Sequence, residues 1–142
     1  MKKAAMLFPG QGSQFVGMGK DLVEAYPRIA EIYKEADETL GRPISRLCFG
    51  GEPEILTETR NAQPAILLHS VAVATVLREE GGIEPAIAAG HSLGEYSALA
   101  AVGVLDPMDA LRIVRKRGEL MFEAGLEQPG TCLLYTSPSP RD

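Results

Sequence analysis

The sequence contains no tryptophan, only two cysteines and only two histidines among its 142 residues. Cys48 and Cys132 form no Cys-x-x-Cys pair, and together with His69 and His91 they lack the spacing of a zinc site. We therefore expect neither a structural disulfide nor a bound metal. Basic residues are also few, since 14 Lys and Arg against 19 Asp and Glu give a net charge of −5. That sign disfavours a surface that gathers nucleic acid or anionic lipid, so neither is expected as a partner.

The chain also lacks a long apolar run. No stretch reaches the roughly 18 to 20 apolar residues that a membrane-spanning helix needs, and the signal-like start at Lys2 is interrupted by Pro9. We therefore expect a cytoplasmic protein without a membrane partner. What the chain does have is 45% hydrophobic and 23% charged residues, the composition of one globular domain with a packed core.

The last residues, Cys132 to Asp142, differ from the patterned segment before them. They read CLLYTSPSPRD, a Pro- and Ser-rich run with no helical or alternating period. One interpretation is a short disordered tail. The interpretation that we favour is the in-frame translation of a common transposon-based sequencing adapter, because every residue of the run fits it, and such scars are excluded from fold prediction. We predict a natural part at 1–131, cut short within its gene, and a non-native tail at 132–142.

Hydrophobic patterning predicts strands that alternate with helices. The apolar run at 4–8 is typical of a strand buried on both faces. The region 42–59 is expected to form short helices and turns. The alternation predicts an α/β layer fold with a parallel sheet. The expected segments are strands at 4–8 and 83–89, and helices at 21–40 (broken at Pro27), 65–80 (with Pro64 in its first turn), 95–102 and 107–126 (capped by Asp106).

A Gly-x-Ser-x-Gly pentapeptide, GHSLG, lies at Gly90 to Gly94 where the second predicted strand gives way to a helix. This context is that of a nucleophile elbow. A tight turn there would expose the Ser92 hydroxyl at the carboxyl edge of the sheet, with the Leu93 N–H and the helix N-terminus facing a developing oxyanion. The alternative is a glycine-rich turn in which Ser92 only caps the helix.

A serine nucleophile needs a general base, and the two histidines are poor candidates. His91 adjoins Ser92 on the same turn, so its side chain is expected to diverge from the hydroxyl. His69 lies mid-helix among apolar residues and is expected to be a hydrogen-bonded core histidine. We therefore expect the base to be missing from this chain, which fits a truncated sequence better than a new mechanism.

Arg117 differs from the other basic residues of the last predicted helix. It shares one apolar stripe with Ala110, Val114 and Met121, and a guanidinium in such a stripe must be paired. Its partner is either an internal carboxylate or the carboxylate of a substrate held bidentately. The remaining charged residues are expected on a solvated face: Arg112, Arg115, Lys116 and Glu119.

Four segments together resemble the malonyl-CoA:acyl carrier protein transacylase family of fatty acid synthesis. They are 8–14 (FPGQGSQ), 63–65 (QPA), 90–98 (GHSLGEYSA) and 117–118 (RG). They stand in the family's order and spacing, and the likeness spans about residues 3–131. Acyltransferase domains of polyketide and animal-type fatty acid synthases share these motifs, but the plain N-terminal start favours the discrete enzyme.

The resemblance implies an enzyme that transfers a malonyl group from malonyl-CoA to the phosphopantetheine thiol of acyl carrier protein in a ping-pong cycle. Ser92 would carry the malonyl ester, and the N–H groups of Gln11 and Leu93 would form the oxyanion hole. Arg117 would bind the malonyl carboxylate. The other substrate-binding positions are His91 and Gln63. No cofactor is implied besides the coenzyme A thioester, which is a substrate, and the complete protein is expected to be a monomer.

The resemblance also indicates what the chain lacks. The family has a hydrolase-like α/β subdomain interrupted by a smaller ferredoxin-like one, and Cys132 falls where the smaller one would begin. The family's principal base is a histidine further along. We therefore expect an incomplete hydrolase-like sheet with flanking helices, inactive or nearly so, and of low stability because an open sheet edge and apolar faces are left uncovered.

Three other functions stay open. One is the acyltransferase domain of a polyketide synthase, and another is a serine esterase or lipase-like hydrolase with the same elbow. The FPGQGSQ motif and Arg117 count against the hydrolase. The third is a non-catalytic remnant that docks a carrier protein, which the missing histidine would favour if 132–142 were genuine.

Overall fold

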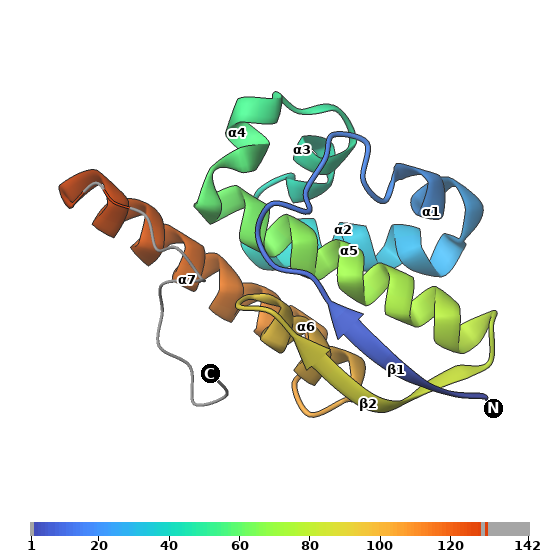
Figure 1. Cartoon of the computed structure of the whole chain (residues 1–142). Coiled ribbons are helices and arrows are strands. Elements are labelled where there is room, and N and C mark those ends of the chain that lie inside the picture. Colours follow the sequence, from blue (N-terminus) through green and yellow to red (C-terminus); the bar gives the residue numbers. More distant parts are fainter. Residues whose placement is uncertain (1, 129, 131–142) are drawn as a thin grey trace, which may run out of the picture.

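The computed structural model describes residues 2–128 and residue 130, so the predicted tail at 132–142 lies outside the described residues. Two strands, β1 (Lys2–Phe8) and β2 (Ile83–Gly90), pair in parallel, with helices stacked on one side of them (Figure 1). Ala4 pairs with Pro85 and Ala5 with Ile87, so β2 carries one extra residue at this irregularity. The predicted α/β class with a parallel sheet is confirmed.

The helices of the described part follow the predicted order. Gly41 ends α2 (Pro27–Leu40) with a left-handed φ of 62°, and the Asp106 carboxylate caps α7 (Pro107–Glu127) by accepting from the N–H groups of Met108 (2.9 Å) and Asp109 (3.1 Å). Both ends are as the sequence predicts. The helices are α1 (Lys20–Ala25), α2 (Pro27–Leu40), α3 (Ile44–Gly50), α4 (Pro53–Thr57), α5 (Thr59–Glu79), α6 (Gly94–Ala101) and α7 (Pro107–Glu127).

The prediction that β1 is buried on both faces is wrong for the described chain. Met6 and Phe8 are buried against α5 and α6, but Leu7 is 81% exposed, and Ile87 of β2 is 68% exposed. The reason is that the described helices cover one face of the sheet only (Figure 1). A strand with one covered face alternates between buried and exposed positions, whatever its hydrophobicity.

Helix α5 forms the centre of the molecule, as its apolar circumference predicts. Almost every residue from Asn61 to Ala74 is buried, and the helix contacts α2, α3, α4, α6 and α7 as well as β2 (Figure 1). The main core is built on its side chains together with those of α2 and α7. Whatever the first turns of α5 hold in place is therefore fixed relative to the whole molecule.

The predicted start of this helix is wrong, because α5 begins at Thr59 and Pro64 lies inside it. A proline inside a helix has no N–H to donate, so the carbonyl four residues earlier loses its partner. Here that carbonyl belongs to Arg60, and it accepts a hydrogen bond of 2.6 Å from Nη1 of Arg115 in α7. The contact from α7 lets the helix continue through the proline.

Helix α7 approaches the first turn of α5 very closely at Gly118. A methyl group on Gly118 would lie 2.8 Å from the Thr59 carbonyl oxygen and 2.9 Å from the Arg60 Cα, which are backbone atoms. Beside this contact, the Arg60 guanidinium lies over the Phe122 ring at 4.1 Å from its centroid. The close approach thus requires glycine for lack of space.

No helix in the described part of the chain is long and apolar enough to cross a membrane.

Replacing Gly118 by alanine should lower the free energy of unfolding by about 1 to 3 kcal/mol, because the added methyl group pushes α7 away from the α5 backbone. The matched control is Gly125→Ala in the same helix, where the added methyl group meets nothing within 4 Å. The control should be neutral or stabilise by up to about 1 kcal/mol, since alanine is the better helix former. Urea unfolding followed by circular dichroism measures both, and equal midpoints would show that no close approach exists.

Candidate active site

The turn after β2 holds Ser92 in a strained conformation. Ser92 has a φ of 54°, and no other non-glycine residue in the described part of the chain has a positive φ. A methyl group on Gly90 would lie 1.9 Å from the Gly94 carbonyl oxygen, and one on Gly94 would lie 2.4 Å from the Phe8 carbonyl oxygen. Both glycines are therefore required by close backbone contacts, and the exposed Ser92 side chain stands at the end of the strand. This geometry is that of a nucleophile elbow.

The glycine-rich loop after β1 lies against this elbow. The His91 N–H donates to the Phe8 carbonyl (3.1 Å), and a methyl group on Gly10 would lie 2.6 Å from Nδ1 of His91. The loop is also held internally, because Ser13 Oγ donates to the Gly10 carbonyl at 2.9 Å. Gln11 directly follows the contact with His91, so the loop brings Gln11 to the same edge of the sheet as Leu93.

A continuous run of side-chain hydrogen bonds connects the loop to Ser92. The Thr59 hydroxyl donates to Gln11 Oε1 (2.7 Å), and Gln63 Nε2 donates to Thr59 Oγ1 (2.7 Å). Arg117 donates through Nη1 to Gln63 Oε1 and through Nη2 to Ser92 Oγ (2.9 Å). The structure thus brings together three of the predicted site residues, Gln11, Gln63 and Arg117, with Ser92.

Arg117 carries an uncompensated positive charge next to Ser92. Both of its partners, Gln63 Oε1 and Ser92 Oγ, are neutral, and within residues 2–128 no carboxylate forms an ion pair with it. Arg117 as a whole is half-buried. The alternative of an internal carboxylate partner therefore has no support in the described part, and the charge of Arg117 is left to pair with the carboxylate of a ligand.

Neither histidine acts on Ser92 in this arrangement. The His91 imidazole packs against Gly10 and forms no hydrogen bond with Ser92 Oγ among the described residues. His69 packs edge-on to Phe15, with 6.3 Å between ring centroids, and burial lowers its pKa. The prediction of a hydrogen-bonded core histidine is wrong in one respect, since Nδ1 of His69 has no partner among the described residues. The hydrogen-bond partner of Ser92 Oγ is the Arg117 guanidinium, which cannot accept a proton.

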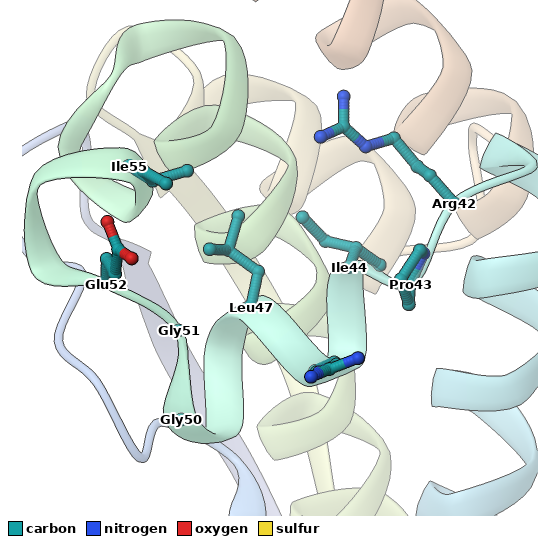
Figure 2. A pocket seen from close by; sticks show the side chains of 9 residues that line it. Arg42, Pro43, Ile44, Leu47, Gly50, Gly51, Glu52 and Ile55 are labelled. Carbon is teal, nitrogen blue, oxygen red and sulfur yellow. The ribbon is translucent and has the colours of Figure 1, made fainter.

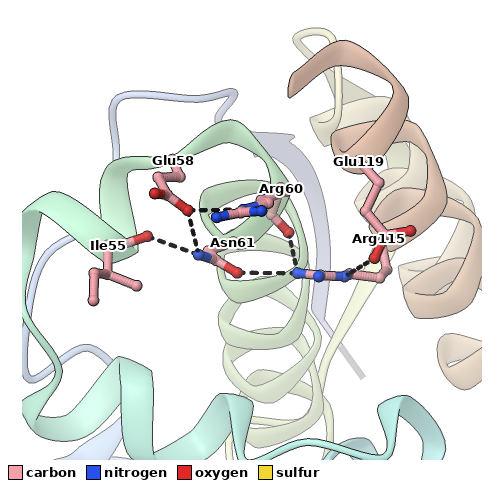
Figure 3. Close-up of polar contacts among 6 residues, drawn as sticks. All are labelled: Ile55, Glu58, Arg60, Asn61, Arg115 and Glu119. Carbon is pink, nitrogen blue, oxygen red and sulfur yellow. Dashed lines mark hydrogen bonds and ion pairs between the residues drawn. The ribbon is translucent and has the colours of Figure 1, made fainter. Parts of the chain in front are cut away.

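The prediction of a solvated face is wrong for Arg115. Its side chain is only 14% exposed, and Nη1 also donates to Asn61 Oδ1 (3.0 Å) while Nε donates to Glu119 Oε1 (2.7 Å), as Figure 3 shows. Arg112, by contrast, is 57% exposed. Pro64 could have indicated that the Arg60 carbonyl needs a partner such as Arg115. This argument requires that the helix be predicted to begin at Thr59 rather than after Pro64. Thr59, which joins Gln11 to Gln63, gave no signal at all.

A pocket of about 370 Å³ lies between α3 and α4, and neither Ser92 nor Arg117 is part of its lining (Figure 2). Its lining includes Arg42, Leu47 and Ile55 but no serine, cysteine or histidine. Burial lowers the pKa of Arg42, and the like charges of Arg115 and Arg60 lower it further. The pocket therefore offers no nucleophile. Among the described residues, no cluster of three or more His, Cys, Asp and Glu side chains could hold a metal ion.

Comparison with known proteins agrees with the geometry of the elbow. A family model described as the acyl transferase domain matches residues 5–135. The chain belongs to this family. One relative, the malonyl CoA-acyl carrier protein transacylase of Bacillus subtilis (strain 168), is 57% identical over 124 residues, which are 87% of this chain and 39% of the relative. The chain thus spans about two fifths of the length of that relative.

Solved structures of this family share the fold of the described part. An acyl carrier protein S-malonyltransferase from Vibrio cholerae is 47% identical, with a TM-score of 0.80 over 87% of this chain and 40% of that one. A malonyl-transacylase solved in complex with its type II polyketide synthase acyl carrier protein is 48% identical, also with a TM-score of 0.80 and covering the same shares. The two-stranded sheet and its helices are therefore part of the acyltransferase fold.

Ser92→Gly should unfold at higher urea than Ser92→Ala, by about 1 kcal/mol in free energy. Both variants lose the hydrogen bond to Arg117, but only glycine adopts the left-handed φ of 54° without strain. Chemical denaturation of the pair isolates the strain at the elbow. Equal stabilities, or a less stable glycine variant, would contradict a strained turn.

Proposed function

We propose that the chain is the N-terminal part of a malonyl-CoA:acyl carrier protein transacylase of fatty acid synthesis, acting through a malonyl ester of Ser92. The observation that carries the proposal is the Arg117 guanidinium, unneutralised by any described carboxylate and 2.9 Å from Ser92 Oγ. A cation at this distance from a nucleophile favours an acyl group that ends in a carboxylate. The printed names of the relatives support the same acyl group, malonyl, and the same acceptor, acyl carrier protein.

The chemistry follows from the roles that we assign. Ser92 Oγ attacks the thioester carbonyl carbon of malonyl-CoA, its proton passes to a general base, and the backbone N–H groups of Gln11 and Leu93 stabilise the oxyanion. The C–S bond then breaks and coenzyme A leaves as a thiol. In the second half, the phosphopantetheine thiol of the carrier protein attacks the ester, a new C–S bond forms, and the Ser92 hydroxyl is restored. Gln63 orients Arg117, and His91 supports the loop at Gly10.

The general base belongs, in this proposal, to the part of the relatives that the chain does not span. We likewise propose that residues 1–131 are part of the acyltransferase α/β subdomain and that 132–142 are a non-native tail. The family match reaches residue 135, four residues past the proposed boundary. The genomic sequence is therefore the test of this boundary. Genomic sequence beyond Thr131 that continues in frame to a later histidine would support this division, and a native stop after Asp142 would contradict it.

Intact-protein mass after incubation with malonyl-CoA tests the proposed function directly. Two proteins are compared: the 142-residue chain and a chimera in which residues 1–128 continue into the part of the Bacillus subtilis relative beyond the aligned region. We expect a malonyl adduct, mapped to Ser92 by peptide analysis, on the chimera only. An adduct on the short chain would mean that His91 or His69 serves as base, and no adduct on either protein would favour a hydrolase or a non-catalytic remnant.

Ser92→Ala in the chimera should abolish the adduct, because the Ser92 hydroxyl is the group that the proposed cycle acylates. The measurement is the mass of the intact protein after incubation with isotopically labelled malonyl-CoA. A labelled acyl-protein that persists in this variant would contradict the assignment of Ser92.

Arg117→Ala in the chimera should reduce malonyl transfer much more than acetyl transfer, by about 10-fold or more, since only the malonyl group presents a carboxylate to the guanidinium. Parallel rates with malonyl-CoA and acetyl-CoA give the ratio. Arg112→Ala, which removes an exposed arginine of the same helix, should leave both rates unchanged. Equal losses for the two acyl groups in Arg117→Ala would show that Arg117 is structural.

A further inference from the structure

We infer that Arg115 is a positioning residue, which sets the place of Arg117 and thereby the preference for a carboxylate-bearing acyl group. It touches neither Ser92 nor any predicted substrate-binding side chain in the described part of the chain. The inference rests on the proposed function, because it concerns the specificity of that same site. Arg115 lies outside the four sequence segments that resemble the transacylase family.

The vacancy that Arg115 fills is created by Pro64. In a regular helix the N–H of residue 64 would donate to the Arg60 carbonyl, but proline has none. Nη1 of Arg115 donates to that carbonyl at 2.6 Å instead. A half-buried carbonyl without a partner is costly, so this bond fixes the register between α7 and the first turns of α5.

Arg115 is also anchored on its own side of the contact. Glu119, one turn further along α7, accepts from its Nε, and Asn61 accepts from Nη1 (Figure 3). Asn61 in turn donates to the Ile55 carbonyl (2.9 Å) and to Glu58 Oε2 (3.2 Å), so that the network joins α4, α5 and α7. Arg115, Asn61, Glu119 and the Arg60 carbonyl are each hydrogen-bonded, which makes the arrangement rigid.

Arg117 lies on the other side of the same contact. Successive residues of a helix are rotated by about 100°, so Arg115 and Arg117 project roughly 200° apart and Gly118 lies between them, against the α5 backbone. Arg115 holds the Arg60 carbonyl, and Arg117 holds Gln63 one turn later in α5. A rotation of α7 that released Arg115 would therefore carry the Arg117 guanidinium away from Gln63 and Ser92.

The test compares Arg115→Met with Arg115→Lys in the chimera, and Arg112→Met serves as the matched control on the same helix. Two readouts are used. The rate at which phenylglyoxal modifies Arg117, measured by peptide mass spectrometry, reports how firmly the guanidinium is held and needs no activity. The ratio of malonyl to acetyl transfer reports its effect on specificity.

Arg115→Met should raise the modification rate of Arg117 about fivefold and lower the ratio of malonyl to acetyl transfer about 10-fold. A change of about 10-fold is the effect expected when one charge-assisted hydrogen bond is weakened. Arg115→Lys should lie between this variant and the parent, because an ammonium reaches the carbonyl but cannot also hold Asn61 and Glu119. Arg112→Met should match the parent protein in both readouts.

A second background isolates the carbonyl. Pro64→Ala restores the N–H that donates to the Arg60 carbonyl, so Arg115→Met should have a clearly smaller effect in Pro64→Ala than in the parent. Effects of equal size in the two backgrounds would overturn the inference, and so would Arg115→Met values equal to those of Arg112→Met. If the parent chimera forms no malonyl adduct, the proposed function fails, while the modification rates still decide the role of Arg115.

Discussion

The close contact between α7 and the first two turns of α5 is the constraint on which the candidate site depends. Pro64 leaves the Arg60 carbonyl free, Arg115 takes it, and Gly118 lets the two backbones meet beside it. The same turns of α5 present Thr59 to the glycine-rich loop and Gln63 to Arg117. Helix α5 is also the centre of the core. The glycine-rich loop, the elbow and Arg117 are therefore all held in fixed positions relative to this one helix.

Whereas the contact between α5 and α7 stabilises the fold, the conformation of the elbow at Ser92 is strained. Ser92 is held at a left-handed φ that L residues rarely adopt, and the glycines around it are required because a Cβ there would lie too close to backbone atoms. Such strain is maintained only where the surroundings determine the conformation. Here they do so through the hydrogen bond of His91 to β1 and the packing of Gly94 on the same strand end.

Much of this arrangement could be predicted from the sequence. The pentapeptide around Ser92 lies where a strand period gives way to a helix, and Arg117 stands out because its phase differs from that of its charged neighbours. Arg115 could not be found in this way, since the same phase argument places it on a solvated face. Its burial follows from a carbonyl in another helix, which becomes visible only when α5 is seen to begin before Pro64. Hydrogen bonds between distant segments leave no periodic signal.

The strands show a second limit of prediction. A run of five apolar residues does not reveal how many layers cover it, and Leu7 and Ile87 are exposed because the described helices pack on one face alone. Likewise, the apolar neighbours of His69 predict its burial but not whether its ring nitrogen finds a partner. In each case the answer depends on which other segments pack against the one in question, and its own sequence does not contain that information.

The most direct test is a crystal structure of the chimera with the malonyl group trapped on Ser92. We predict that the malonyl carboxylate accepts two hydrogen bonds from Arg117, while Arg115 stays on the Arg60 carbonyl and the helix contact is unchanged. A carboxylate bound away from Arg117, or an Arg117 that reaches it only after Arg115 leaves the carbonyl, would show that α5 and α7 do not hold a preformed cation beside the nucleophile.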